Sequence, residues 1–205
     1  MVVIEQFDQK DGKSVKALAR LHVRAFPDFF LTRLGVSFLR ALYAGYIYDE
    51  KSGIIVAKSD GITVGFIAYS NDYPNFFRNL IKKHLLKFAF CSAKAAILHP
   101  SYVKRIFGAF KKSDQVKKPE KYVELASICV DPAFGKRGIG TMLINKLKET
   151  VDFKEFAYIN LETDANDNDP VNAFYVKNGF KLNRTYVTGE GRPMNEYIYK
   201  PEENV

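Results

Sequence analysis

The sequence predicts a mixed α/β (α+β) fold, in which helices pack on a central sheet. Two observations support this class: a hairpin-type turn, Asp60-Gly61, joins two early strand-like segments, and the last third of the chain alternates strand-like and helix-like segments. The 205 residues are 47% hydrophobic and 26% charged, which excludes disordered, collagen-like and coiled-coil chains. We expect residues 1–205 to form one domain that carries an insertion at about residues 74–118.

The first 70 residues contain both strand and helix signals. Apolar residues at helical spacing predict helices over residues 14–25 and 34–48, with Ser14 as a cap of the first helix and Pro27 just beyond its end. An aromatic-rich loop, Phe26–Phe30, connects the two helices. Strands are expected over residues 2–6, 53–57 and 62–70.

From Tyr122 onward the strand and helix signals alternate. Ile139, Leu143 and Leu147 fall on one side of an amphipathic helix, and Gly179 is a typical left-handed stop for the helix after it. The expected strands cover residues 122–130, 156–163, 181–188 and 195–200, and the expected helices cover residues 138–150 and 171–178.

The net charge of +8 comes from one block of the chain. Residues 76–118 hold eleven Lys and Arg and one acid, so the rest carries 31 − 11 = 20 basic and 23 − 1 = 22 acidic residues. Such asymmetry indicates an anionic partner, either a membrane surface or a phosphorylated small molecule; nucleic acid is not expected, because no reading motif is present. The alternative is a pair of solvated amphipathic helices that bind nothing, followed by a linker over residues 111–120.

The positions of the cysteines and histidines bear on metal binding and on the redox environment of the protein. Cys91 and Cys129 lie far apart and match no metal-binding spacing, and the three histidines match none either. We therefore expect no metal and a reduced, cytoplasmic protein without a signal peptide or a membrane-spanning helix. Cys129 is expected to be a buried structural thiol rather than a nucleophile.

The most informative segment is a glycine-rich turn, Gly135-Lys-Arg-Gly-Ile-Gly-Thr141, between a strand and a helix. The first turn of a helix presents unpaired N–H groups, its dipole favours anions, and glycine lets a bulky diphosphate approach the backbone. The turn therefore predicts a pyrophosphate site. It lacks the third glycine of a dinucleotide fingerprint and the Gly-Lys-Ser/Thr ending of an NTPase loop.

This turn is one of several motifs that occur together in a fixed order. They are Val130-Asp-Pro132, Gly135–Gly140, Asn168–Tyr175 and Asn178-Gly-Phe180. Over residues 122–180 the chain resembles the GNAT superfamily of acetyl-CoA-dependent N-acetyltransferases. The resemblance implies a mostly antiparallel sheet of about seven strands flanked by helices, and acetyl-CoA as cosubstrate. It does not extend over the basic block, where apolar residues at helical spacing predict a helical insertion after the early hairpin.

The resemblance also implies which residues hold the carrier. Main-chain groups of one strand would bind the pantetheine arm, the glycine-rich turn would surround the pyrophosphate, and Asn168 would contact the arm. These residues are Ile128, Cys129, Val130, Gly135, Lys136, Arg137, Gly138, Ile139, Gly140, Thr141, Asn168 and Tyr175. The family usually has Arg or Gln where this chain has Gly135, so one side-chain contact to the phosphates is missing.

Two residues are candidates for proton transfer. By the resemblance, Tyr175 would protonate the departing thiolate as a general acid; the alternative is an aromatic that packs the core. Glu124 matches a position at which some members place the general base; the alternatives are a carboxylate paired with a lysine, and a water relay. On a regular strand Glu124, Ala126 and Ile128 share one face, which would point the carboxylate along the acyl channel.

By the resemblance, the acceptor site is expected at the first two helices and the loop between them. Phe29 and Phe30 supply aromatic walls, and Asp28 and Arg33 supply charges for a ring with polar substituents; the alternative is that the aromatics only pack the junction. The predicted function is transfer of an acetyl group to a primary amine of a small molecule, for instance an amino sugar or a nucleotide-linked amino sugar. Alternatives are a protein acetyltransferase and a non-catalytic CoA-binding or membrane-associated module.

Overall fold

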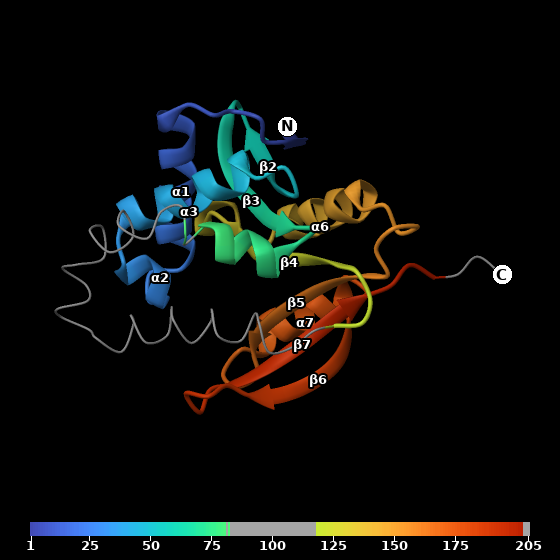
Figure 1. Ribbon diagram of the computed structural model, residues 1–205. Coiled ribbons are helices and arrows are strands. Elements are labelled where there is room, and N and C mark those ends of the chain that lie inside the picture. The colour runs from blue at the N-terminus through green and yellow to red at the C-terminus, as the bar shows by residue number, and fades with distance from the viewer. Residues whose placement is uncertain (81, 83–117, 203–205) are drawn as a thin grey trace.

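The computed structural model of the protein describes residues 1–80, 82 and 118–202. The strands span Val2–Gln6 (β1), Ser52–Ser59 (β2), Ile62–Ser70 (β3), Tyr122–Val130 (β4), Tyr158–Asp164 (β5), Lys181–Val187 (β6) and Pro193–Tyr199 (β7). Within these residues they form one seven-stranded sheet in the order β1-β2-β3-β4-β5-β7-β6 (Figure 1). Every neighbouring pair is antiparallel except β4 and β5, so the predicted mixed fold with a mostly antiparallel sheet is confirmed.

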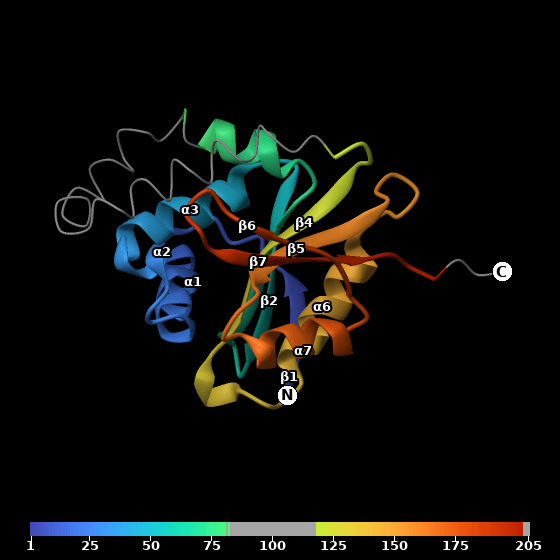
Figure 2. The same ribbon diagram turned by 90° about the horizontal axis from the view of Figure 1, so that it is seen from below.

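Helices cover both faces of this sheet. They span Gly12–Ala25 (α1), Phe30–Arg33 (α2), Val36–Tyr48 (α3), Ile139–Thr150 (α6) and Asp169–Lys177 (α7), with a 3-10 turn at Pro132–Phe134. α1, α2 and α3 lie on one face, and α6 and α7 lie on the other (Figure 2). The coverage explains the continuous apolar run of β2: Ile54 and Val56 pack towards α1 and α3, whereas Ile55 and Ala57 pack towards α6.

Three local predictions need correction. The cap of α1 is Asp11, whose Oδ1 accepts from the backbone N–H groups of Lys13 and Ser14 at 2.9 and 3.0 Å, so Ser14 lies in the first turn. The helix predicted over residues 34–48 begins two residues later, at Val36, because Gly35 has a φ of 93° and separates α3 from the short helix α2.

The third correction concerns the faces of β4. Ser127 pairs with Ala68 and Leu125 pairs with Tyr69, so Ala126 is an extra residue in a β-bulge. After a bulge the side chains change faces: Ala126 packs in the core under α1 and α3, and Ile128 packs against α6. Ala126 and Ile128 therefore do not share a face, contrary to the regular alternation assumed from the sequence.

The first residues of the predicted basic insertion fold onto α3. Residues 73–80 are helical, and Phe76 and Leu80 are buried in the core beneath α1 and α3. A Cβ on Gly45 of α3 would lie 2.3 Å from Cδ1 of Leu80, so the close approach requires glycine. Most of the remaining insertion, including nearly all of its lysines, lies outside the described residues.

Candidate active site

β4 and β5 are paired over three residues of each strand and then diverge. Tyr122, Val123 and Glu124 pair with Tyr158, Ile159 and Asn160, and the pairing ends there. β4 runs on to Val130, and β5 continues to Asp164 while it pairs with β7. The edge of β4 that faces β5 is therefore left without a strand partner, and an extended chain can add to such an edge through main-chain hydrogen bonds.

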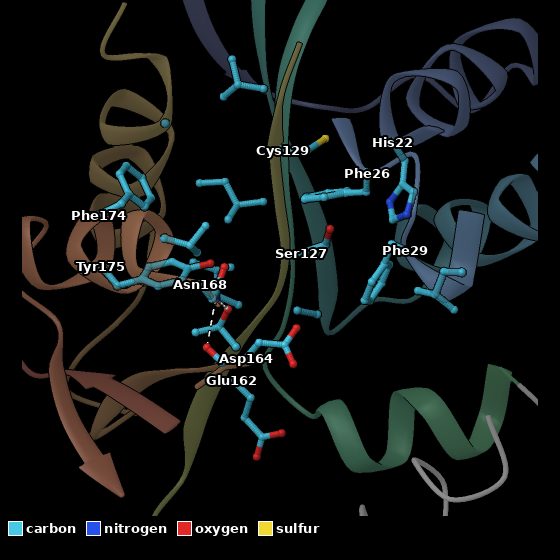
Figure 3. A pocket seen from close by; sticks show the side chains of 18 of the residues that line it. His22, Phe26, Phe29, Ser127, Cys129, Glu162, Asp164, Asn168, Phe174 and Tyr175 are labelled. Carbon is cyan, nitrogen blue, oxygen red and sulfur yellow. Dashed lines mark hydrogen bonds between the residues drawn. The ribbon is translucent and has the colours of Figure 1, made fainter. Parts of the chain in front are cut away.

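A cavity of about 1070 Å³ lies where the two strands part. β4 divides it into two sides (Figure 3): Phe174 and Tyr175 lie on one side, and His22, Phe26 and Phe29 lie on the other. The first side, formed by α6, α7 and the turn before α6, is called the carrier side below. The second side, formed by α1, α2, α3 and residues 73–80, is called the acceptor side.

The carrier side contains the glycine-rich turn. Lys136 and Gly138 have φ angles of 60° and 77°, and Gly138 precedes the first residue of α6 without a side-chain cap. The first N–H groups of α6 are thus left for a ligand, and both the helix dipole and Lys136 favour an anion there. Gly140 brings α6 close to α7, because a Cβ at this position would lie 3.0 Å from Cζ of Phe174.

The structure brings eleven of the twelve predicted carrier-binding residues to the cavity. They are Ile128, Cys129, Val130, Gly135, Lys136, Gly138, Ile139, Gly140, Thr141, Asn168 and Tyr175. Arg137 is not among the lining residues; its guanidinium lies 5.1 Å from the centre of the Phe134 ring. The Cys129 side chain is buried in the core under α1 and α3, and burial raises the pKa of its thiol far above the usual range, which leaves it unreactive.

Asn168 has a structural role at the end of β5. Its Nδ2 donates to Oγ1 of Thr163 at 2.8 Å and to the carbonyl oxygen of Asp164 at 3.0 Å. Asn172, one turn later in α7, donates to the same Asp164 carbonyl at 3.1 Å. These bonds fix the start of α7 against β5 and thereby set the position of Tyr175.

Tyr175 projects from α7 towards β4 across the carrier side (Figure 3). Its ring packs against Phe174, Phe180 and Tyr197, and only 6% of the residue is exposed. Burial raises the pKa of the phenol well above its usual value, so the hydroxyl stays protonated at neutral pH. The ring therefore belongs to the core, and the residue also lines the cavity; its role as a general acid stays a prediction.

Glu124 lies at the fork between β4 and β5. It is 8% exposed, and its Oε2 accepts a hydrogen bond of 2.7 Å from Nδ2 of Asn160. Burial, reinforced by the nearby Glu162, raises the pKa of Glu124 to about 8, while Asn160 and Lys118 act in the opposite direction. A carboxyl group with this pKa can accept a proton near neutral pH.

A network of polar side chains behind Glu124 was not predicted from the sequence. Nζ of Lys118 donates to Oδ1 of Asn160 at 2.6 Å and forms an ion pair of 3.2 Å with Glu196. It also lies 4.6 Å from the centre of the Tyr122 ring. Lys118 was expected in a linker, but its side chain is only 12% exposed, so this end of the segment is anchored at the fork. In the sequence alone, a lysine at the end of a basic run does not differ from the other lysines of that run.

The acceptor side is lined mainly by apolar and aromatic side chains. Phe29 and Phe30 line it as predicted, together with Tyr43, Tyr73 and Phe77. Asp28 and Arg33 are not brought to the cavity; they lie 3.9 Å from each other, and Asp28 is 93% exposed. The lining residues Glu162, Thr163 and Asp164 lie at the end of β5, between the two sides.

No group of three or more His, Cys, Asp or Glu side chains within residues 1–80, 82 and 118–202 is arranged to hold a metal ion. In the same part of the chain, no helix is long and apolar enough to cross a bilayer.

Comparisons with known proteins agree with this geometry. The chain resembles a GNAT-family protein from Desulfovibrio desulfuricans (14% identity, TM-score 0.64, 98% and 99% of the two chains covered). It also resembles the ribosomal-protein-S18-alanine N-acetyltransferase of Escherichia coli, at 15% identity and a TM-score of 0.56, with 100% of this chain and 99% of the other covered. A third structure is that of a provisionally named streptothricin acetyltransferase from Bacillus anthracis in complex with acetyl coenzyme A. The match has 18% identity and a TM-score of 0.50, and it covers 77% of this chain and 67% of the other.

At these identities the structural matches establish the fold alone, and no curated protein matches the sequence. The model of the acetyltransferase (GNAT) family matches residues 15–180, which is most of the chain. That stretch includes α1 to α3, the fork and the glycine-rich turn. The protein therefore belongs to the GNAT acetyltransferase family.

Proposed function

We propose that this protein transfers an acetyl group from acetyl-CoA directly to a primary amine of a small molecule. The observation that carries the proposal is the fork at Glu124, where an unpaired strand edge, a free helix N-terminus and two buried proton-transfer groups border one cavity. The edge of β4 suits the pantetheine arm, and the turn before α6 suits the pyrophosphate.

The two titratable groups have complementary roles. Glu124 takes a proton from the acceptor ammonium group, and the free amine attacks the thioester carbonyl carbon. The carbon–sulfur bond of the tetrahedral intermediate then breaks, and Tyr175 gives its phenolic proton to the departing thiolate. The nitrogen of the new amide loses its second proton to the Tyr175 phenolate, so the products are the neutral amide and the CoA thiol, and Glu124 releases its proton to solvent. Burial keeps Glu124 able to accept a proton near pH 8 and keeps Tyr175 protonated, as these two roles require.

The acceptor side supports an amine with a flat or apolar body. Among the described lining residues, the lysines and arginine are Lys136, Lys177 and Arg192, and none of them belongs to α1, α2, α3 or residues 73–80. Arg192 is already paired with Asp164 at 2.5 Å. A ring such as an amino sugar can stack on the aromatic walls, whereas a phosphate of a nucleotide-linked acceptor would depend on basic residues outside the described part of the chain.

Two alternatives have specific tests. Tyr73, Phe77 and Leu80 close one wall of the acceptor side, which favours a small acceptor over a protein segment. A non-catalytic CoA-binding module would bind acetyl-CoA without releasing thiol, and a membrane-associated module would float with anionic liposomes at low salt.

The test is thiol release from acetyl-CoA against a panel of primary amines, amino sugars, sugar nucleotides and peptides. Thiol release together with an acetylated small amine supports the proposal, and mass spectrometry of the product identifies the nitrogen that carries the acetyl group. Acetyl-CoA binding without thiol release for any member would support the non-catalytic alternative. Release with peptides alone would support the protein acetyltransferase.

A further inference from the structure

His22 is a buried polar residue in the wall of the acceptor side that the steps above do not use. It lies on α1, is 2% exposed and lines the cavity. Its Nδ1 is 2.6 Å from the hydroxyl of Tyr43, but its Nε2 has no hydrogen-bond partner. Among the described residues, Nε2 of His22 is the one buried side-chain nitrogen or oxygen atom that has no hydrogen-bond partner.

An unpartnered ring nitrogen in a protein interior costs stability, because it has lost its water without a replacement. The surroundings of His22 are aromatic: its ring centre lies 5.1 Å from that of Phe26, 6.1 Å from Phe29 and 5.9 Å from Tyr43. Figure 3 shows His22 beside Phe26 and Phe29, on the side of β4 where Ser127 also lies. The unpaired nitrogen thus belongs to a side chain that lines the space proposed for the acceptor.

The same surroundings restrict what can bind there. Burial lowers the pKa of His22 to about 4, so the imidazole is neutral at physiological pH and offers no charge to a carboxylate or phosphate. Nε2 is a donor or an acceptor according to which ring nitrogen holds the proton, and the contact with Tyr43 is compatible with both tautomers. A hydroxyl group donates and accepts equally well, so it suits either tautomer.

We infer that Nε2 of His22 binds a hydroxyl group of the acceptor amine and thereby selects hydroxylated amines over their deoxy analogues. This inference rests on the proposed acetyl transfer. Glu124 and His22 are then two polar contacts in an otherwise aromatic site, one for the amine and one for the hydroxyl.

The test uses pairs of amines that differ by one hydroxyl group. Tyramine and 2-phenylethylamine provide an aromatic body, and trans-4-aminocyclohexanol and cyclohexylamine provide an alicyclic body closer to a sugar. For at least one pair, wild-type protein should have a kcat/KM about 10-fold higher for the hydroxylated member, as expected for one neutral hydrogen bond in a buried site. The pair that shows the preference identifies the body that the aromatic walls accept.

Substitutions separate the hydrogen bond from the packing. His22→Leu should bring the ratio of the two kcat/KM values to about 1, and His22→Gln, which keeps a donor and an acceptor, should restore part of it. Phe29→Leu is the matched control. It changes the apolar wall, so it should lower kcat/KM for both members of a pair and leave the ratio of the two values unchanged. Acetyl-CoA affinity, measured by calorimetry, should be the same in all three variants.

Three results would overturn the inference. The first is equal activity on both members of each pair in the wild type, and the second is a preference that survives His22→Leu. The third combines two observations: none of these four amines is acetylated, and the ¹⁵N resonance of Nε2 does not change when tyramine or trans-4-aminocyclohexanol is added to the CoA-bound protein. An ordered water would then be the partner of Nε2. Failure of the proposed function is distinguishable, since it would leave the whole amine panel unreacted.

Discussion

Asn160 joins Glu124 to the rest of the protein: its Nδ2 donates to Oε2 of Glu124 over 2.7 Å, across the last pair of residues that β4 and β5 share. Its Oδ1 accepts from Lys118, which is paired in turn with Glu196. The carboxyl group proposed as general base is thus held at the point where the sheet opens. Its pKa depends on groups from β5, β7 and the segment before β4.

The first prediction concerns the pH dependence of activity. Glu124 must be deprotonated to accept a proton, and its pKa is about 8, so kcat/KM should rise with pH through about 8 and then level off. The groups that face Glu124 are Glu162, Glu196 and Lys118, whose charges contribute to this pKa, and Asn160, whose hydrogen bond lowers it. Initial rates from pH 6 to pH 9.5 measure the profile. A profile that is flat over this range would exclude Glu124 as the base.

The second prediction concerns the effect of Lys118 on the pKa of Glu124. Lys118→Met keeps the length of the side chain but removes the charge and the bond to Asn160, so the pKa of Glu124 should rise and the activity profile should move to higher pH. Lys121→Met is the matched control, because Lys121 is 70% exposed and pairs with Glu155 on the surface. Unchanged midpoints in both variants would contradict the coupling.

The third prediction concerns stability. The ordinary pKa of a glutamate is 4.5, and the folded protein raises that of Glu124 to about 8, so the folded state keeps a proton that the unfolded chain releases. Wild-type stability should therefore fall as the pH rises from about 4.5 to about 8. Glu124→Gln has no proton to lose, so it should melt on the order of 5 °C above the wild type at pH 9. This gain should vanish below pH 4.5, and thermal melts at both ends of the range test it.

The fourth prediction concerns Tyr175. Tyr175→Phe keeps the ring in the core but removes the phenolic proton, so kcat should fall about 100-fold while acetyl-CoA affinity stays close to that of the wild type. Tyr199→Phe is the control, since Tyr199 packs on the same core and does not line the cavity. Thiol release measures the first effect and calorimetry the second. Equal kcat in the two variants would reject Tyr175 as the acid.

The fifth prediction uses two glycines with the same backbone angle. Gly138 and Gly61 both have a φ of 77°, and neither has a neighbouring atom within 4 Å of the position of a Cβ. Alanine should cost each of them about 1 kcal/mol of stability, because L-residues avoid this conformation. Only Gly138→Ala should also weaken acetyl-CoA binding, by about 10-fold, since it distorts the turn that presents the N–H groups of α6. Equal affinity in both variants would remove the turn from the carrier site.

The sequence by itself determined the elements and the carrier side. Strand and helix signals predicted all seven strands of the described sheet. The apolar runs of β2 and β3 are long because both faces of these strands are covered, whereas β6 is mostly exposed. The glycine-rich turn is local chemistry, so its position between β4 and α6 follows from adjacent residues. The motifs from Val130 to Phe180 were likewise sufficient for the family.

Only the tertiary structure decided the surroundings of the reacting groups. The bulge at Ala126 changes which face each residue of β4 presents, and no local signal marks it. Lys118, Asn160 and Glu196 are far apart in the chain and meet behind Glu124 because β4, β5 and β7 are neighbours in the sheet. The unpaired nitrogen of His22 is likewise a property of packing, since burial and the absence of a partner depend on side chains from several elements.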